Sequence, residues 1–179
     1  MKILLITNSS WNIINFRSNL VKALVEEGHK VIILANRDKY SDSLKQLNCS
    51  YEEIKFQSSS INPYFEFKLF FNLFFKIKSI NPDFILSFTI KPNLYASLSA
   101  KFLKIKTINN IAGLGIAHSN FFLRNFTKYL YKFCLSRTNW CFFQNINDLS
   151  YFVNNTIIPK TKTGLLPGSG VDIQKFRIS

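Results

Sequence analysis

Two short apolar runs decide the fold: Lys2-Ile-Leu-Leu-Ile6 and, further along, Lys30-Val-Ile-Ile-Leu-Ala35. Each has the length and composition of a buried strand, and the second is rich in β-branched residues. Between them, apolar residues recur with a helical period from Asn15 to Glu27, and Gly28 ends that pattern. A strand, a helix and a second strand in this order predict a right-handed βαβ unit on a parallel sheet.

The alternation of strands and helices continues along the rest of the chain. We predict further strands at 51–56, 84–88, 105–108, 140–143 and 164–166, and helices at 38–47, 63–79, 92–103, 121–137 and 147–153. No internal repeat interrupts the pattern. The sequence therefore predicts an α/β fold, an open and mostly parallel Rossmann-like sheet of about seven strands with helices on both faces.

The composition is that of a basic and unusually aromatic globular chain. Its 179 residues fit one domain, and 23 Lys and Arg against 10 Asp and Glu give a net charge of +13. The 19 phenylalanines argue against plain nucleic-acid binding, because a basic nucleic-acid footprint normally has a polar surface. An excess of both Phe and Lys suits a protein that binds an anionic membrane surface. The alternative explanation of this composition is an AT-rich genome, which favours Lys, Asn, Ile and Phe.

Neither a disulfide framework nor a metal site is expected. The three cysteines are odd in number and form no Cys-x-x-Cys motif. No stretch reaches the roughly 18 apolar residues of a membrane span, and the first residues are too short an apolar run for a signal peptide. We therefore expect a cytoplasmic protein whose membrane contact, at the inner face of the cell membrane, is peripheral.

One predicted helix carries the aromatic excess. From Phe65 to Ser79, polar residues that include Lys68 and Lys76 form one narrow stripe, while phenylalanines such as Phe71 and Phe75 cover a wide arc. The helix is either wedged between the sheet and a neighbouring helix, or its surplus aromatics enter a lipid interface beside basic residues. The predicted helix at 121–137 has a similar arrangement.

The loops that follow the strands are the expected ligand site. In open parallel sheets, ligands bind beyond the carboxyl ends of the strands, which selects residues 7–15, 87–93, 109–120, 144–148 and 167–172. The first of these loops contains no glycine, and a dinucleotide fingerprint needs glycines there for the backbone to approach a pyrophosphate. A nicotinamide or flavin dehydrogenase is therefore disfavoured, and no Walker lysine motif is present.

The chain carries an ordered set of short motifs, several of them on these loops and each weak alone. In order they are Asn15-Phe-Arg17, Leu20-Val-Lys-Ala-Leu24, Gly28-His-Lys-Val31, Ser60-Ile-Asn-Pro63, Asn81-Pro-Asp83, Thr89-Ile-Lys-Pro-Asn93, Asn109-Asn-Ile-Ala-Gly-Leu-Gly115, Gln144-Asn145 and Leu166-Pro-Gly-Ser-Gly-Val-Asp172 with Phe176. In this order they resemble the amino-terminal half of a family 4 glycosyltransferase, of the kind that builds bacterial surface polysaccharides and lipid-linked oligosaccharides. The resemblance covers essentially the whole chain. Two departures are the glycine-free first loop and the asparagines at 109 and 110, where several members carry a histidine.

The resemblance implies a GT-B architecture, in which two Rossmann-like domains face each other across a cleft. Residues 1–179 would be the N-terminal, acceptor-binding domain, and the C-terminal donor-binding domain would be absent from this chain. The reaction would be retaining transfer from a nucleotide-sugar to a polyprenyl-diphosphate-linked glycan, with no metal and no further cofactor. Since the family's paired glutamates belong to the second domain, no catalytic residue is assigned and the isolated chain is expected to be inactive. The alternative is a membrane-associated accessory subunit of a split glycosyltransferase, paired with its donor domain in trans.

The resemblance also assigns candidate residues for acceptor or substrate binding. They are Arg17 at the start of the first predicted helix and, on the selected loops, Thr89, Lys91, Asn93, Asn110, Gly113, Gly115, His118 and Asn145. Arg17 would bind an acceptor phosphate or form a structural pair, and Lys91 would supply a cation or be a solvated lysine. Gly168, Ser169 and Gly170 would form the loop between the domains. Lys68, Phe71, Phe75 and Lys76 are the membrane-surface candidates.

Overall fold

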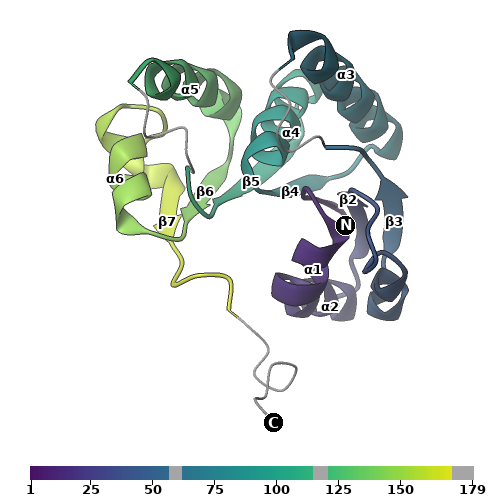
Figure 1. The fold of residues 1–179 in the computed structure, drawn as a ribbon. Coiled ribbons are helices and arrows are strands. Elements are labelled where there is room, and N and C mark those ends of the chain that lie inside the picture. Colours follow the sequence, from purple (N-terminus) through teal and green to yellow (C-terminus); the bar gives the residue numbers. More distant parts are fainter. Residues whose placement is uncertain (57–61, 115–120, 171–179) are drawn as a thin grey trace.

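The computed structural model of the chain describes residues 1–56, 62–114 and 121–170 (Figure 1). These residues form one sheet with the strand order β3-β2-β1-β4-β5-β6-β7, in which every neighbouring pair is parallel. The strands are β1 Lys2–Ile6, β2 Lys30–Ala35, β3 Ser50–Glu53, β4 Phe84–Phe88, β5 Lys106–Ile111, β6 Trp140–Phe143 and β7 Thr163–Leu165. The predicted open, parallel, Rossmann-like sheet is confirmed.

Helices cover both faces of this sheet, as expected. They are α1 Ser10–Phe16, α2 Ser18–Glu26, α3 Pro63–Ile80, α4 Ile90–Leu103, α5 Phe121–Cys134 and α6 Ile146–Asn154, with short 3-10 turns at Asp42–Leu47, Leu135–Arg137 and Lys160–Lys162. The helices α3, α4 and α5 lie side by side on one face, whereas α1 and α2 lie on the other (Figure 1). Among the described residues, no helix combines the length and apolarity needed to cross a bilayer.

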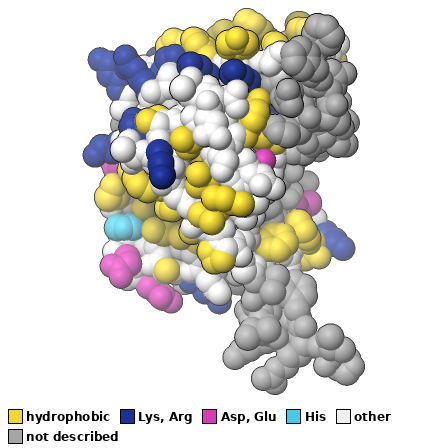
Figure 2. All heavy atoms as spheres, turned by 90° about the vertical axis from the view of Figure 1, so that its left-hand side faces the viewer, with side chains coloured by type: hydrophobic (Ala, Val, Ile, Leu, Met, Phe, Trp, Pro, Cys, Tyr) yellow, Lys and Arg dark blue, Asp and Glu magenta, His cyan; other side chains and the backbone are white. Residues whose placement is uncertain are grey.

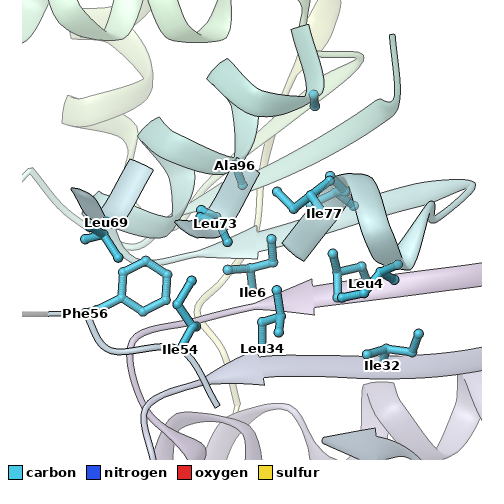
Figure 3. Packing of buried hydrophobic residues seen from close by; sticks show 13 residues of the cluster. Leu4, Ile6, Ile32, Leu34, Ile54, Phe56, Leu69, Leu73, Ile77 and Ala96 are labelled. Carbon is cyan, nitrogen blue, oxygen red and sulfur yellow. The ribbon is translucent and has the colours of Figure 1, made fainter. Parts of the chain in front are cut away.

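The alternation of side chains along β1 explains the two-sided core. Leu4 and Ile6 point into the cluster under α3 and α4, while Ile3 and Leu5 point into the cluster under α1 and α2. Figure 3 shows the first cluster, where Ile6 and Leu34 of the strands meet the α3 side chains, among them Leu73. Strands buried on both faces need apolar residues at every position, which is why the runs in β1 and β2 are continuous.

The first crossover consists of two helices, and the prediction of a single helix over Asn15 to Glu27 is wrong. Ser9 caps α1 by accepting a hydrogen bond from the Asn12 N–H. The backbone then breaks at Arg17, with φ −132° and ψ 1°, before α2 begins at Ser18. The apolar period runs across the break, so periodicity alone could not reveal it.

Two other boundaries differ at the carboxyl edge of the sheet. The strand β5 extends to Ile111, so Asn109 and Asn110 belong to a strand and not to the following loop. The helix α4 begins at Ile90, so Pro92 is its third residue and not its first. Both differences lengthen the regular structure next to the expected ligand site.

A buried polar network holds this edge together. The Asn109 side-chain nitrogen donates to the hydroxyls of Ser87 and Ser97, both at 2.7 Å, and the Thr138 hydroxyl donates to the Asn109 side-chain oxygen at 2.5 Å. Ser87 in turn donates to the Asn93 side-chain oxygen at 2.7 Å. The network links β4, β5, α4 and the turn before β6 through side chains that are all buried.

We predict that Asn109→Ala lowers the free energy of unfolding by about 3 kcal/mol, because it removes the buried hydrogen bonds of Asn109 to the hydroxyls of Ser87, Ser97 and Thr138 and leaves a cavity in their place. Urea denaturation followed by far-UV circular dichroism measures the change. Asn72→Ala, at an exposed position of α3, is the matched control and should stay within about 0.5 kcal/mol of the parent. Equal effects of the two substitutions would show that the network contributes nothing.

Candidate functional site

A groove of about 520 Å³ opens at the carboxyl edge of the sheet, where the order of the strands reverses between β1 and β4. It is lined by the junction of α1 and α2, by the ends of β4, β5 and β6 and by the segment after β7. In chain order, the lining residues include Arg17, Phe88, Thr89, Asn110, Gln144 and Ser169. A hollow of about 290 Å³ continues from it to the first residues of α2. The structure thus brings residues from all five selected loops to one place, with Asn12 representing the first of them.

Arg17 is the central charge of this groove. Its side chain is only 7% exposed, and its guanidinium lies 4.6 Å from the centre of the Phe88 ring. One terminal nitrogen donates to the Phe16 carbonyl at 3.0 Å, whereas the buried Nε has no hydrogen-bond partner. Burial lowers the pKa of Arg17, but an arginine pKa begins so far above neutrality that the group stays charged.

No carboxylate neutralises this charge within the described part of the chain. The ion pairs of residues 1–56, 62–114 and 121–170 join Lys45 to Asp42, Lys76 to Glu52 and Lys91 to Glu66. Burying a guanidinium without a counter-charge is costly. Arg17 is therefore a cation poised for an anionic ligand.

The segment that follows β7 is fixed to the groove by Gln144. The Gln144 side-chain nitrogen donates to the Ser169 hydroxyl at 2.7 Å and to the Asn110 side-chain oxygen at 3.2 Å. Gly168 and Gly170 on either side of Ser169 have φ of 111° and 69°, which other residues rarely adopt. The three residues predicted to form the inter-domain loop thus line the same hollow as Arg17.

Thr89 carries backbone strain at the groove wall. Its φ of 70° and ψ of 164° fall in a region used almost only by glycine, and its hydroxyl donates to the Phe88 carbonyl at 2.5 Å. Its own carbonyl accepts the Asn93 N–H of α4 at 3.0 Å. Such strain concentrates at ligand sites, where it aims backbone groups that a relaxed conformation would turn elsewhere.

Lys91 lies in a second hollow of about 280 Å³, which it lines together with Thr89 and Gly113. Its ammonium group forms an ion pair of 2.6 Å with Glu66 of α3, and the Tyr95 hydroxyl donates to the other oxygen of that carboxylate. Burial, together with this carboxylate, raises the pKa of Tyr95 well above its ordinary value. The pair ties the first turns of α3 and α4 together beside the groove.

The other predicted residues occupy different places. Asn93 is buried, donates to the Asn110 carbonyl at 2.8 Å and so positions Asn110. Asn145 caps α6, where its oxygen accepts the Asp148 N–H at 2.8 Å. A Cβ added at Gly113 would meet no atom within 4 Å, so that glycine is not required by packing. Gly115 and His118 lie outside the described residues.

Two groove residues, Gln144 and Phe88, were not assigned as binding candidates, although both lie in segments that the rule on strand ends selected. Gln144 is the first polar residue after the apolar run of β6, and the sequence analysis used it only as part of a motif. Phe88 reads only as a core phenylalanine, because its contact with Arg17 joins positions 71 residues apart in sequence. Within the described residues, no three His, Cys, Asp or Glu side chains come close enough to hold a metal.

The membrane-surface candidates lie on the outer side of α3. Phe71 and Phe75 are 44% and 59% exposed, and Lys68 is exposed as well. Lys76 forms an ion pair of 3.0 Å with Glu52, so part of its charge is balanced within the protein. Figure 2 shows hydrophobic side chains along the upper edge of the molecule, where α3 and α5 lie, with Lys and Arg side chains beside them.

Comparison with known proteins gives one family and several related folds. Residues 2–145 match the family described as glycosyl transferase 4-like. A Campylobacter jejuni protein, N,N'-diacetylbacillosaminyl-diphospho-undecaprenol alpha-1,3-N-acetylgalactosaminyltransferase, is 28% identical over 182 residues, which cover 98% of this chain and 48% of that protein. The chain thus spans about half the length of its curated relative.

Two solved structures share the fold. A glycosyltransferase from Rickettsia africae superposes with a TM-score of 0.67 and 18% identity, over 98% of this chain and 45% of that one. A UDP-GlcNAc 2-epimerase from Neisseria meningitidis bound to UDP-GlcNAc gives a TM-score of 0.63 and 19% identity, over 92% of this chain and 45% of that one. At this identity the likeness concerns the fold alone, and the same fold serves different reactions.

We predict that Thr89→Gly raises the free energy of unfolding by about 1 kcal/mol, because relief of strain exceeds the extra freedom that glycine gives the unfolded chain. Urea denaturation measures the change. Thr163→Gly is a matched control: Thr163 also donates to a backbone carbonyl, that of Lys160 at 2.8 Å, but has an ordinary φ of −123°. The control should lose about 1 kcal/mol. A similar loss in both variants would refute strain at Thr89.

Proposed function

The chain belongs to the glycosyl transferase 4-like family, and from that membership we propose that it is the acceptor-binding half of a retaining glycosyltransferase. The donor is a nucleotide-sugar, and the acceptor is a polyprenyl-diphosphate-linked glycan used in bacterial surface polysaccharide synthesis. The name of the C. jejuni relative, which specifies a sugar on diphospho-undecaprenol, supports this class of acceptor.

The observation that carries the proposal is the groove at the carboxyl edge of the sheet, where the buried guanidinium of Arg17 forms no ion pair with the described residues. Glycosyl transfer between two diphosphate-bearing substrates needs cations around the phosphates and a site that orients the acceptor hydroxyl while excluding water. Arg17 supplies such a cation, and Thr89, Asn110 and Ser169 supply polar groups around it. The donor site and the reacting carboxylates then come from a C-terminal domain facing this groove.

A second candidate, a non-catalytic accessory subunit of a split glycosyltransferase, uses the same groove. In this case the donor domain is a separate polypeptide. Both candidates predict that the isolated chain binds acceptor without transferring sugar. They differ in whether the donor domain is joined in cis or associates in trans.

We also propose that the protein contacts the inner face of the cell membrane through an aromatic face on two helices, formed by Tyr64, Phe67, Phe71, Phe75, Phe126, Tyr129 and Phe133. These seven side chains are exposed, which is unusual for large aromatics. The helices α3, α4 and α5 together carry eight Lys and Arg but a single carboxylate, Glu66, which pairs with Lys91. Anionic headgroups complement that charge, and the aromatic rings suit the lipid interface.

The aromatic face begins next to the groove. The ion pair between Glu66 and Lys91 joins the first turns of α3 and α4, and Lys91 is two residues after Thr89, which lines the groove. A lipid-linked acceptor can therefore keep its chain in the bilayer while its sugar reaches the groove. Nucleic acid is not expected as a partner, because this basic surface is aromatic rather than polar.

The proposed function predicts that the purified chain binds an undecaprenyl-diphosphate-linked sugar in detergent micelles more tightly than undecaprenol or UDP-sugars, and transfers no sugar. Microscale thermophoresis measures the affinities, and a radiolabelled UDP-sugar assay measures transfer. The phosphate-free undecaprenol controls for binding to the lipid chain alone. Robust transfer by the isolated chain, or tighter binding of UDP-sugars than of the lipid-linked sugar, would contradict the acceptor-half assignment.

The membrane contact predicts that the double variant Phe71→Ser with Phe75→Ser binds vesicles containing phosphatidylglycerol at least tenfold more weakly. Each lost ring removes about 1–2 kcal/mol of partial burial in the interface. Vesicle sedimentation measures the binding, and circular dichroism checks the fold. Ile146→Ser is the control, since Ile146 is 57% exposed at the start of α6, away from the aromatic face. Unchanged vesicle binding of a folded double variant would remove the proposal.

A further inference from the structure

We propose that Arg17 and the amino terminus of α2 together form a binding site for a phosphate group, and that the groove receives a diphosphate there. This inference rests on the proposed function, which it makes specific by naming the group that is bound and the residues that bind it. It assigns the site to the second helix of the first crossover, not to the loop directly after β1.

The start of α2 is an uncompensated helix end. The helix runs for nine residues from Ser18 to Glu26, its first turn contains no acidic residue, and no side chain caps it. The first backbone N–H groups of a helix point outward with a partial positive charge, and negative groups are stabilised there. Ser18, Asn19 and Leu20 line the hollow of about 290 Å³ that opens from the groove.

Arg17 immediately precedes this helix end, where a cation is disfavoured by the helix dipole. Its guanidinium is buried, forms no ion pair among the described residues and leaves Nε without a hydrogen-bond partner. Phe88 packs against the guanidinium and keeps it at the groove. Two positive features thus meet at one point, and a bound anion would satisfy both.

The donors around this point suit a tetrahedral oxyanion with several acceptor oxygens. The guanidinium offers a planar set of N–H groups, and a helix start offers successive backbone N–H groups. Across the hollow lie the Ser169 hydroxyl and the backbone of Gly168 and Gly170, held in place by Gln144. With a groove of about 520 Å³ adjoining the hollow, there is room for a diphosphate with its attached groups.

Two substrates of the proposed reaction carry this group: the lipid-linked acceptor and the nucleotide-sugar. Both substrates contain a diphosphate ester, and the guanidinium of Arg17 could bind the diphosphate of either one. The acceptor is favoured because the hollow lies within the acceptor-side domain of the proposed enzyme. The experiment below separates the two sources.

The test is titration of the 179-residue chain with inorganic pyrophosphate by isothermal calorimetry. We expect Arg17→Met to weaken pyrophosphate binding at least tenfold while the melting temperature without ligand stays the same or rises, since a buried unpaired charge is removed. Arg37→Met, the same change at an exposed arginine, should leave binding within twofold. Equal affinity of the parent and the Arg17→Met variant would overturn the proposal.

A second variant tests the site without touching Arg17. Asn19→Asp adds a negative charge at the start of α2 with almost no change in volume, at an exposed position that the fold tolerates. We expect it to raise the melting temperature, because the carboxylate complements the helix end and Arg17, and to weaken pyrophosphate binding at least fivefold. Unchanged pyrophosphate binding in a folded Asn19→Asp protein would place the anion elsewhere and overturn the proposal.

Competition identifies the source of the diphosphate. Farnesyl diphosphate and UDP are each titrated against bound pyrophosphate, in the parent chain and in the Arg17→Met variant. Displacement by farnesyl diphosphate that depends on Arg17 supports the site and its acceptor assignment. Displacement by UDP alone supports the phosphate site but contradicts the acceptor-half function. If the parent chain does not bind pyrophosphate and neither ligand binds, the proposed phosphate site is overturned. The proposed function is then judged separately, by the binding of the lipid-linked sugar described above.

Discussion

The reversal of strand order between β1 and β4 is the constraint on which the rest of the structure depends. All seven strands run parallel, so their carboxyl ends share one edge, and the crossovers on the two sides of the reversal leave in opposite directions. The junction of α1 and α2, the end of β4 and the segment after β7 can meet only at that edge. The groove is therefore a consequence of topology, and its chemistry depends on which side chains stand there.

That chemistry is dominated by a positive charge that forms no ion pair with any residue the structure describes. Most lysines of the molecule lie at its surface, and Lys76 and Lys91 have carboxylate partners, whereas Arg17 is buried against an aromatic ring beside an uncapped helix end. The protein gives up stability to keep a desolvated cation there. The nearby strain at Thr89 and the anchoring of Ser169 by Gln144 belong to the same region. The proposed anion-binding groove would account for these features together.

Sequence reasoning found the sheet and many of the groove residues, and its failures have identifiable causes. Continuous apolar runs mark β1 and β2. The rule on strand ends selected Thr89 and Ser169, the family resemblance selected Arg17, and the structure brings all three to one groove. The break at Arg17 was hidden because the apolar period continues across it. The polar end of β5 resembled a loop, because the partners that satisfy Asn109 come from β4, α4 and the turn before β6. The Lys91 pair with Glu66 joins positions 25 residues apart, which no local pattern reveals.

Backbone NMR of the isotopically labelled chain during titration with inorganic pyrophosphate is the most direct test of this account. It reports the location of the bound anion without any substitution. The account predicts that the largest amide shifts occur at Ser18, Asn19 and Leu20 and at Ser169 and Gly170, with the Arg17 Nε–H signal moving at the same ligand concentration. Shifts confined to exposed lysines on α3 and α5, with these five amides and Arg17 unchanged, would contradict it.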